Sequence, residues 1–92
     1  MSRYILSLDP ATRTQLEWGY DPPLDNVYVH LVVAHEFVDN CGLFSFIPTV
    51  GELMPALADM LTRHRVRQLT DEEAAEMTKQ LIADGADPGD LA

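Results

Sequence analysis

The chain changes its hydrophobic pattern once, near residue 48, and this change constrains the fold more than any other feature of its 92 residues. Before it, apolar and polar side chains alternate, which is typical of β-strands. After it, apolar residues recur every three or four positions. Two Thr-x-x-Glu sequences, which begin at Thr49 and Thr70, mark the starts of helices there. The sequence therefore predicts an α+β domain in which the strands precede the helices.

Three strands are predicted in the first half. Residues 14–20 alternate, and residues 26–38 form the strongest strand signal, with the more apolar face on the odd positions. Residues 39–42 have turn chemistry, so residues 43–47 are expected to pair back as the second strand of a hairpin. Residues 3–8 are ambiguous and could add a short edge strand. The prediction is a three-stranded antiparallel sheet.

Two helices are predicted to pack on one face of that sheet, which gives the order β-β-β-α-α. Pro55 lies too deep for the first position of a helix capped by Thr49, so a kink or a delayed start is expected there. The second helix ends at Asp84-Gly85. The two buried stripes are Val50, Leu53, Met54, Leu57 and Leu61, and Ala74, Met77, Leu81 and Ile82. We expect one domain over residues 1–86 and a mobile acidic tail over residues 87–92.

The chain carries fifteen Asp and Glu against six Lys and Arg, for a net charge of −9. A surface this acidic repels nucleic acid and anionic membranes and favours a basic protein partner. Seven of the acids lie in residues 70–92. We expect Glu72, Glu73 and Glu76 to form an acidic docking surface on the second helix. The alternative is a solvated helix face that only aids solubility.

The face of the sheet opposite the helices is a second candidate surface. With the apolar set on the helix side, it carries Tyr28, His30, Val32, Val38, Leu43 and Ile47, which is unusually apolar. A partner protein or a second copy could bury it, with Tyr28 and Val32 as contacts, or the N-terminal segment could fold over it. Trp18 and Tyr20, beside a diproline, are candidate interface anchors; the alternative is that they pack against the sheet.

No catalytic signature is present, so we expect a non-enzymatic protein without a cofactor. His30, His35, Asp39 and Cys41 are a conceivable metal-binding set, but His30 and His35 point to opposite faces of a strand. Asp39 beside Cys41 is expected to raise the pKa of the thiol and so to disfavour a nucleophile. The basic residues at 63–67 could bind phosphate or an acidic partner. We favour their stabilising a helix C-terminus instead.

Cellular location is inferred from two features. Cys41 is the only cysteine, so no internal disulfide is possible, and a reducing cytoplasm is expected. The longest apolar run, at residues 31–34, is too short to span a bilayer, and the N-terminus lacks the apolar core of a secretory signal.

Residues 19–24 read Gly-Tyr-Asp-Pro-Pro-Leu, and a hydrophobic strand and then Thr-Val-Gly-Glu-Leu at residues 49–53 follow. Over residues 16–62 the chain resembles short uncharacterised bacterial accessory proteins with a G-[WY]-D-x-P-L segment and a T-[VL]-x-x-L helix start. The resemblance implies a setting on plasmids and other mobile elements. By analogy of size, charge and setting, we expect a stoichiometric inhibitor of the anti-CRISPR type that acts on a nucleic-acid-binding protein. The alternatives are a structural homodimer and a small metal-binding protein or enzyme.

Overall fold

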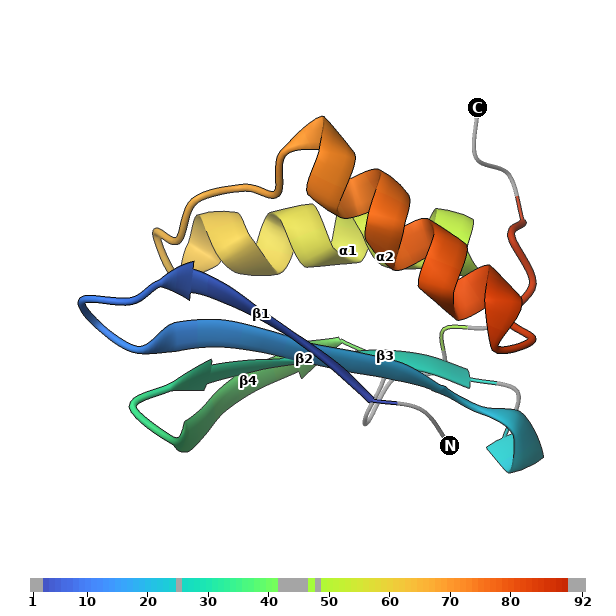
Figure 1. The fold of residues 1–92 in the computed structure, drawn as a ribbon, viewed down its shortest axis with the longest axis horizontal. Coiled ribbons are helices and arrows are strands. Elements are labelled where there is room, and N and C mark those ends of the chain that lie inside the picture. The colour runs from blue at the N-terminus through green and yellow to red at the C-terminus, as the bar shows by residue number, and fades with distance from the viewer. Residues whose placement is uncertain (1–2, 25, 42–46, 48, 90–92) are drawn as a thin grey trace.

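The computed structural model describes residues 3–24, 26–41, 47 and 49–89. Four antiparallel strands lie in the order β1-β2-β3-β4, and two helices cross one face of the sheet (Figure 1). The strands are β1 (Tyr4–Asp9), β2 (Thr14–Asp21), β3 (Asn26–Val33) and β4 (Glu36–Cys41), with a 3-10 turn, η1 (Pro22–Leu24), at the diproline; the helices are α1 (Val50–Arg63) and α2 (Asp71–Ala83). The predicted α+β class, with an antiparallel sheet before two helices, is confirmed. The sheet has four strands rather than three.

The strand that the prediction had left open is β1, formed by the ambiguous N-terminal segment. Among the described strands it pairs with β2 alone. Its register shifts between Ser7 and Asp9, where the strand bulges. The Arg67 Nε donates a hydrogen bond to the Leu8 carbonyl at this end, over a distance of 3.2 Å. β1 therefore forms one edge of the sheet.

The hairpin prediction placed the turn too late. The chain reverses at Ala34 and His35, which both have positive φ, and Val33 pairs with Glu36 across this two-residue loop. Residues 39–41, predicted as a turn, belong to β4 instead. Two left-handed residues are what a tight right-twisted hairpin needs, but neither Ala nor His marks such a site in a sequence. The predicted strand at residues 43–47 lies outside the described residues except for Ile47, which is buried beside the start of β3.

The early turn and a bulge in β4 change which residues face the helices. Val27, Val29 and Leu31 face them as predicted and are fully buried. Phe37, on the odd and more apolar set, lies opposite Val32 and turns to the face without helices. Leu31 pairs with Asp39 and Val32 with Phe37, so β4 has one additional residue, Val38, at this bulge. Val38 lies on the helix side of the sheet, whereas the sequence predicted it on the opposite face.

Both helices start where their capping residues predict. Thr49 accepts a hydrogen bond from the Glu52 amide, and α1 runs through Pro55 without the delayed start. Thr70 and Glu73 form a full capping box on α2. In the two predicted stripes Met54 and Ala74 are half-buried and Ile82 is 39% exposed, whereas the others are buried.

The first residues of the expected tail pack against α1. The carbonyls of Asp87 and Pro88 accept hydrogen bonds from the amides of Val50 and Gly51, at 2.9 and 3.0 Å. These amides belong to the first turn of α1 and have no partner within the helix. Residues 87–89 are therefore part of the packed domain, while residues 90–92 lie outside the described residues.

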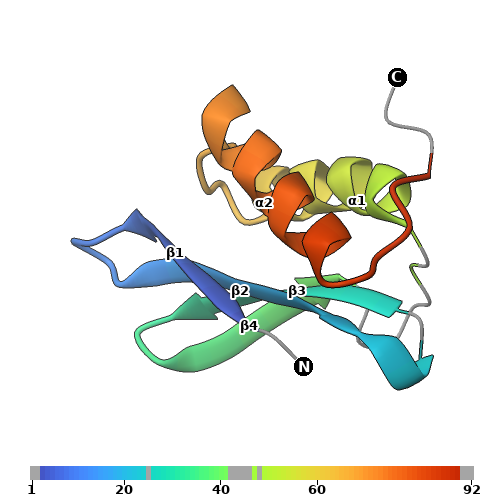
Figure 2. The ribbon, with the colours of Figure 1, turned by 45° about the vertical axis from the view of Figure 1, so that its right-hand side comes forward.

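Each helix covers its own half of the sheet. α2 lies over β1 and β2, where the Trp18 Nε1 donates to the Gln80 Oε1 at 3.2 Å. α1 lies over β3 and β4, where the Cys41 Sγ is 3.8 Å from the Met60 Sδ. A second view shows both helices above the sheet and none below it (Figure 2). We call the covered side the inner face and the other side the outer face.

Candidate interaction surface

The outer face carries a row of rings across β3 and β4, which we call the aromatic strip: Tyr28, His30 and Phe37. The His30 ring lies 5.1 Å from both neighbours, centroid to centroid, and meets Phe37 edge to face. Phe37 is 51% exposed, whereas Val32, its cross-strand partner, is only 8% exposed. Of the predicted outer contacts, Tyr28 is thus half-buried and Val32 is buried, and Phe37 supplies the exposed apolar surface.

His30 is the least satisfied side chain of the strip. Within the described residues its Nε2 atom is inaccessible to solvent and has no hydrogen-bond partner. Burial lowers the pKa of the imidazole, against the opposing effect of Glu17 on the neighbouring strand. The neutral form of His30 is therefore favoured at pH 7, and the ring adds little positive charge to this face.

The three acids predicted on α2 divide into two kinds. Glu73 binds Arg67 through two hydrogen bonds of 2.8 and 3.0 Å and also accepts from the Thr70 amide at 2.9 Å. The Arg67 guanidinium, and then the Thr70 amide, lower the pKa of Glu73 to about 2. The carboxylate of Glu73 is therefore engaged in contacts within the fold.

Glu72 and Glu76 remain available on the same helix. Glu72 is exposed, and among the described residues Glu76 accepts a single hydrogen bond, of 3.3 Å, from the Gln80 amide. Lys79, which the spacing offers as a partner for Glu76, forms no ion pair with it. Most carboxylates in the described part of the chain likewise form no ion pair. They are Asp9, Asp21, Glu36, Glu52, Asp71, Glu72, Glu76, Asp84 and Asp87.

Three of the six Lys and Arg side chains, in contrast, form ion pairs inside the molecule. Arg3 pairs with Glu17, Arg63 with Asp39 and Asp59, and Arg67 with Glu73; these are separate N–O contacts between 2.8 and 3.4 Å. The His64 Nε2 also lies 2.8 Å from the Asp39 carboxylate. The hydrogen bond to His64, and then that to the Asn40 amide, lower the pKa of Asp39. Part of the basic segment at residues 63–67 thus binds acids of this same chain.

Trp18 and Tyr20, the proposed interface anchors, lie on the inner face. They are 5% and 7% exposed, and Trp18 stacks with Tyr4 at a centroid distance of 6.0 Å. The alternation of β2 points both rings toward α2, where their burial stabilises the domain. Both side chains therefore pack within the domain, and little of either is exposed to a partner.

A groove separates α2 from β1 and brings the acids of the helix to the edge of the sheet. Its volume is about 220 Å³, and its lining consists of Tyr4, Ile5, Leu6, Trp18, Glu73, Glu76 and Gln80. Ile5 beside it is 55% exposed. Sequence reasoning missed this site because residues 3–8 were not assigned firmly to a strand. The acidic face predicted for the second helix was the one feature of the sequence that pointed to this groove.

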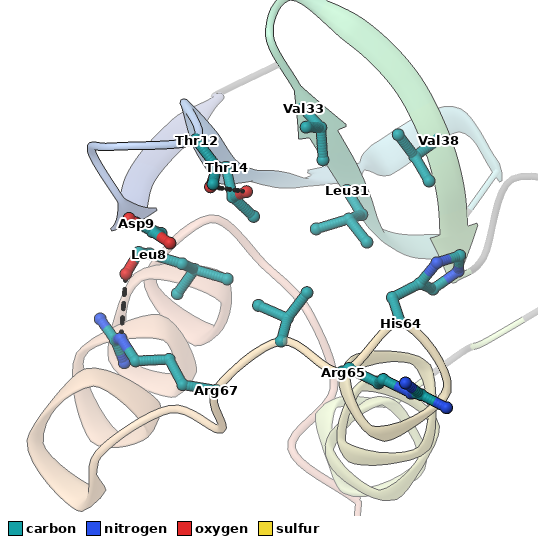
Figure 3. Close-up of a pocket in the computed structure, with 11 residues that line it drawn as sticks. Leu8, Asp9, Thr12, Thr14, Leu31, Val33, Val38, His64, Arg65 and Arg67 are labelled. Carbon is teal, nitrogen blue, oxygen red and sulfur yellow. Dashed lines mark hydrogen bonds between the residues drawn. The ribbon is translucent and has the colours of Figure 1, made fainter.

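A larger pocket of about 470 Å³ lies between the hairpin tips and the segment that joins the helices (Figure 3). Leu8, Leu31 and Val38 give it apolar walls, and the Thr12 and Thr14 hydroxyls lie 2.7 Å apart on one side. The cations at its margin do not converge on it. Arg67 is turned to the Leu8 carbonyl, and the side chain of Arg65 extends away from the pocket (Figure 3). The pocket thus has no focused charge for an anion.

The conceivable metal set is not assembled. His30 lies on the outer face, Cys41 is buried on the inner face, and His35 occupies the hairpin turn, while Asp39 binds His64. The described residues contain no cluster of three or more His, Cys, Asp or Glu that could hold a metal ion. Burial, with a smaller effect from Asp39, raises the pKa of Cys41 to about 11, so the thiol is a poor nucleophile.

Comparisons with protein-family models, with curated proteins and with solved structures gave no match for this chain. The resemblance to mobile-element accessory proteins stays a prediction. Within the described residues, no helix is both long enough and apolar enough to cross a membrane.

Proposed function

We propose that this protein is a non-enzymatic binding module that acts stoichiometrically on a basic protein. The observation that carries the proposal is the asymmetry of its ion pairs. Arg3, Arg63 and Arg67 are used internally, whereas most carboxylates in the described part of the chain are in no ion pair. Such a surface attracts cationic partners over several ångströms and speeds their association.

The available acids of α2 are the proposed contacts. Glu72 and Glu76 project from a helix whose inner face is fixed by Met77 and Leu81, both fully buried. A rigid helix presents these charges in a constant geometry, so a partner gains Coulomb energy without ordering a loop. A basic partner that handles nucleic acid fits this chemistry, because its phosphate-binding surface carries the Lys and Arg that α2 attracts. Occupying that surface would inhibit the partner.

The test uses the purified protein as bait in a nuclease-treated bacterial lysate, with elution by a salt gradient. One basic protein, released at moderate salt and then purified, is expected to bind directly with 1:1 stoichiometry. The variant Glu72→Gln/Glu76→Gln is expected to weaken its binding about tenfold and to flatten its salt dependence. Unchanged affinity in that variant would contradict the proposal.

A matched control makes the same change in charge elsewhere. Asp21→Asn/Glu36→Gln removes two carboxylates that lie on the strands and form no ion pair among the described residues. A general effect of net charge would weaken binding equally in both variants. A larger loss in the α2 variant is expected, since only there do the carboxylates contact the partner.

A homodimer through the outer face is the second candidate, favoured by the exposed Phe37 ring beside the unsatisfied His30. A second copy would bury the aromatic strip on both sides of a two-fold axis. Light scattering of the parent protein, and of the variant Phe37→Glu, tests it. A dimer that becomes a monomer in the variant supports this candidate, and a monomeric parent rules it out.

A further inference from the structure

β1 is an edge strand that lacks most of the usual protection. An edge strand presents unpaired backbone N–H and C=O groups, and natural proteins commonly block them with Pro, Lys, bulges or covering elements. β1 reads Tyr-Ile-Leu-Ser-Leu-Asp, with no Pro or Lys. Its bulge and the Arg67 hydrogen bond lie at the Leu8 end. In the part of the chain that the structure describes, nothing bonds to the backbone of residues 5–7 from outside the sheet.

The groove between β1 and α2 adds a charge preference to this edge. A strand added beside β1 would extend the sheet beneath α2, with alternate side chains on the inner and outer faces. Inward side chains would enter the groove, which has the apolar walls Leu6 and Trp18 and the carboxylate of Glu76. A Lys or Arg suits this geometry, because its apolar stem can lie along the wall while its charge reaches Glu76.

The outward side chains of the added strand would meet a different surface. They would lie next to Ile5, which is 55% exposed at the margin of the outer face. Apolar residues at these positions would bury that side chain. The two faces of the edge together therefore select alternating basic and apolar residues.

We propose that β1 is a strand-addition site for an extended segment of the partner in which Lys or Arg alternates with apolar residues. The inference rests on the proposed function, because it names the segment by which the basic partner is held. Hydrogen bonds to those backbone groups of residues 5–7 that point away from β2 supply affinity, and Glu76 supplies the preference for charge. A second copy is a poorer occupant, since pairing of two β1 strands would bring the Glu76 carboxylates of both copies, which are in no ion pair, to one seam.

The probe is a short fluorescent peptide in which lysine and valine alternate, compared with two N-methylated versions. One version is methylated at every lysine nitrogen and the other at every valine nitrogen. In a strand, residues of one parity direct their N–H groups to one edge, so only one version blocks the edge that faces β1. That version is expected to lose binding at least about tenfold, while the other retains it. Equal binding by both versions would overturn the proposal, since a purely electrostatic contact treats them alike.

The site is located by NMR on the isotope-labelled full chain. Added peptide is expected to shift the backbone amide signals of residues 5–7 and to slow the hydrogen exchange of those amides that point away from β2. Glu76→Gln is expected to weaken the peptide about threefold to tenfold, whereas Glu52→Gln, on α1, leaves the affinity unchanged. Shifts centred on Phe37, or protection of β1 in a dimer without peptide, would overturn the proposal.

The two proposals can fail separately. If the peptide does not bind β1 while the captured protein still responds to Glu72→Gln/Glu76→Gln, the edge proposal is wrong and the proposed function stands. If the captured protein binds that variant with the affinity it has for the parent, the proposed function is wrong. The peptide measurement still decides whether β1 accepts a strand.

Discussion

Arg67 and Glu73 form a bidentate ion pair in the first turn of α2, with N–O distances of 2.8 and 3.0 Å. The same arginine also donates to the Leu8 carbonyl, and the same glutamate accepts from the Thr70 amide. One pair of side chains thus connects the segment between the helices, the cap of α2 and the edge strand β1. Among the acids of α2, this makes Glu73 a structural residue and leaves Glu72 and Glu76 as the proposed contacts for a partner.

Replacement of Glu73 is therefore expected to destabilise the fold. Glu73→Ala removes both the ion pair and the capping hydrogen bond from the Thr70 amide, and should lower the free energy of unfolding by about 1–2 kcal/mol. Glu73→Gln can retain the capping hydrogen bond and should cost less. Urea unfolding at pH 7 measures both. Glu72→Ala, on the same turn, is the control and should change the stability by less than about 0.5 kcal/mol. An equal loss in the control would contradict the structural role of Glu73.

The stabilising effect of Glu73 should depend on pH. Its pKa falls from 4.5 to about 2 in the folded protein, so the folded state favours the ionised form. The contribution is fully present above about pH 4.5 and is lost as the pH falls toward about 2. The stability difference between the parent and Glu73→Gln should therefore shrink over this range. A difference that stays constant from pH 7 to pH 2 would show that the carboxylate charge has no part in it. The side chain is 23% exposed, so solvent screening limits the effect to about 1 kcal/mol.

Cys41 should react slowly with thiol reagents in the folded protein. Burial raises its pKa from 9.0 to about 11, and the sulfur packs against Met60 inside the core. The shift alone lowers the thiolate fraction near pH 8 by about a hundredfold, and burial slows access further. A chromogenic disulfide reagent, used with and without urea, measures the two rates on this single thiol. Rapid labelling without urea would contradict the burial of Cys41.

The elements with strong local signals were predictable from the sequence. Thr49 and Thr70 begin the helices as expected, because N-capping is a local hydrogen-bond arrangement that the residues themselves specify. The alternation of Leu16, Trp18 and Tyr20 identified β2 for the same reason. The α+β class follows from these elements.

The misassigned elements depend on contacts between distant segments. β1 is short, and its place at the edge of the sheet depends on pairing with β2 and on the distant Arg67. Glu73 looked like any other surface acid because Arg67, six residues away, lies outside the helix. The candidate site was thus half predictable: its acids were visible in the sequence, but the groove and the role of each acid required the fold.

The β3–β4 turn could not be found from the sequence because its residues are poorly suited to it. Ala34 and His35 have φ of 50° and 67°, a region where side chains other than Gly and Asn are strained. The double variant Ala34→Asn/His35→Gly should therefore raise the free energy of unfolding by about 1 kcal/mol. The opposite control, Ala34→Val/His35→Val, places β-branched residues in the same region and should destabilise the fold. Urea unfolding of the two variants should give effects of opposite sign. A destabilised Asn-Gly variant would place the reversal elsewhere, as at the turn over residues 39–42 that the sequence favours.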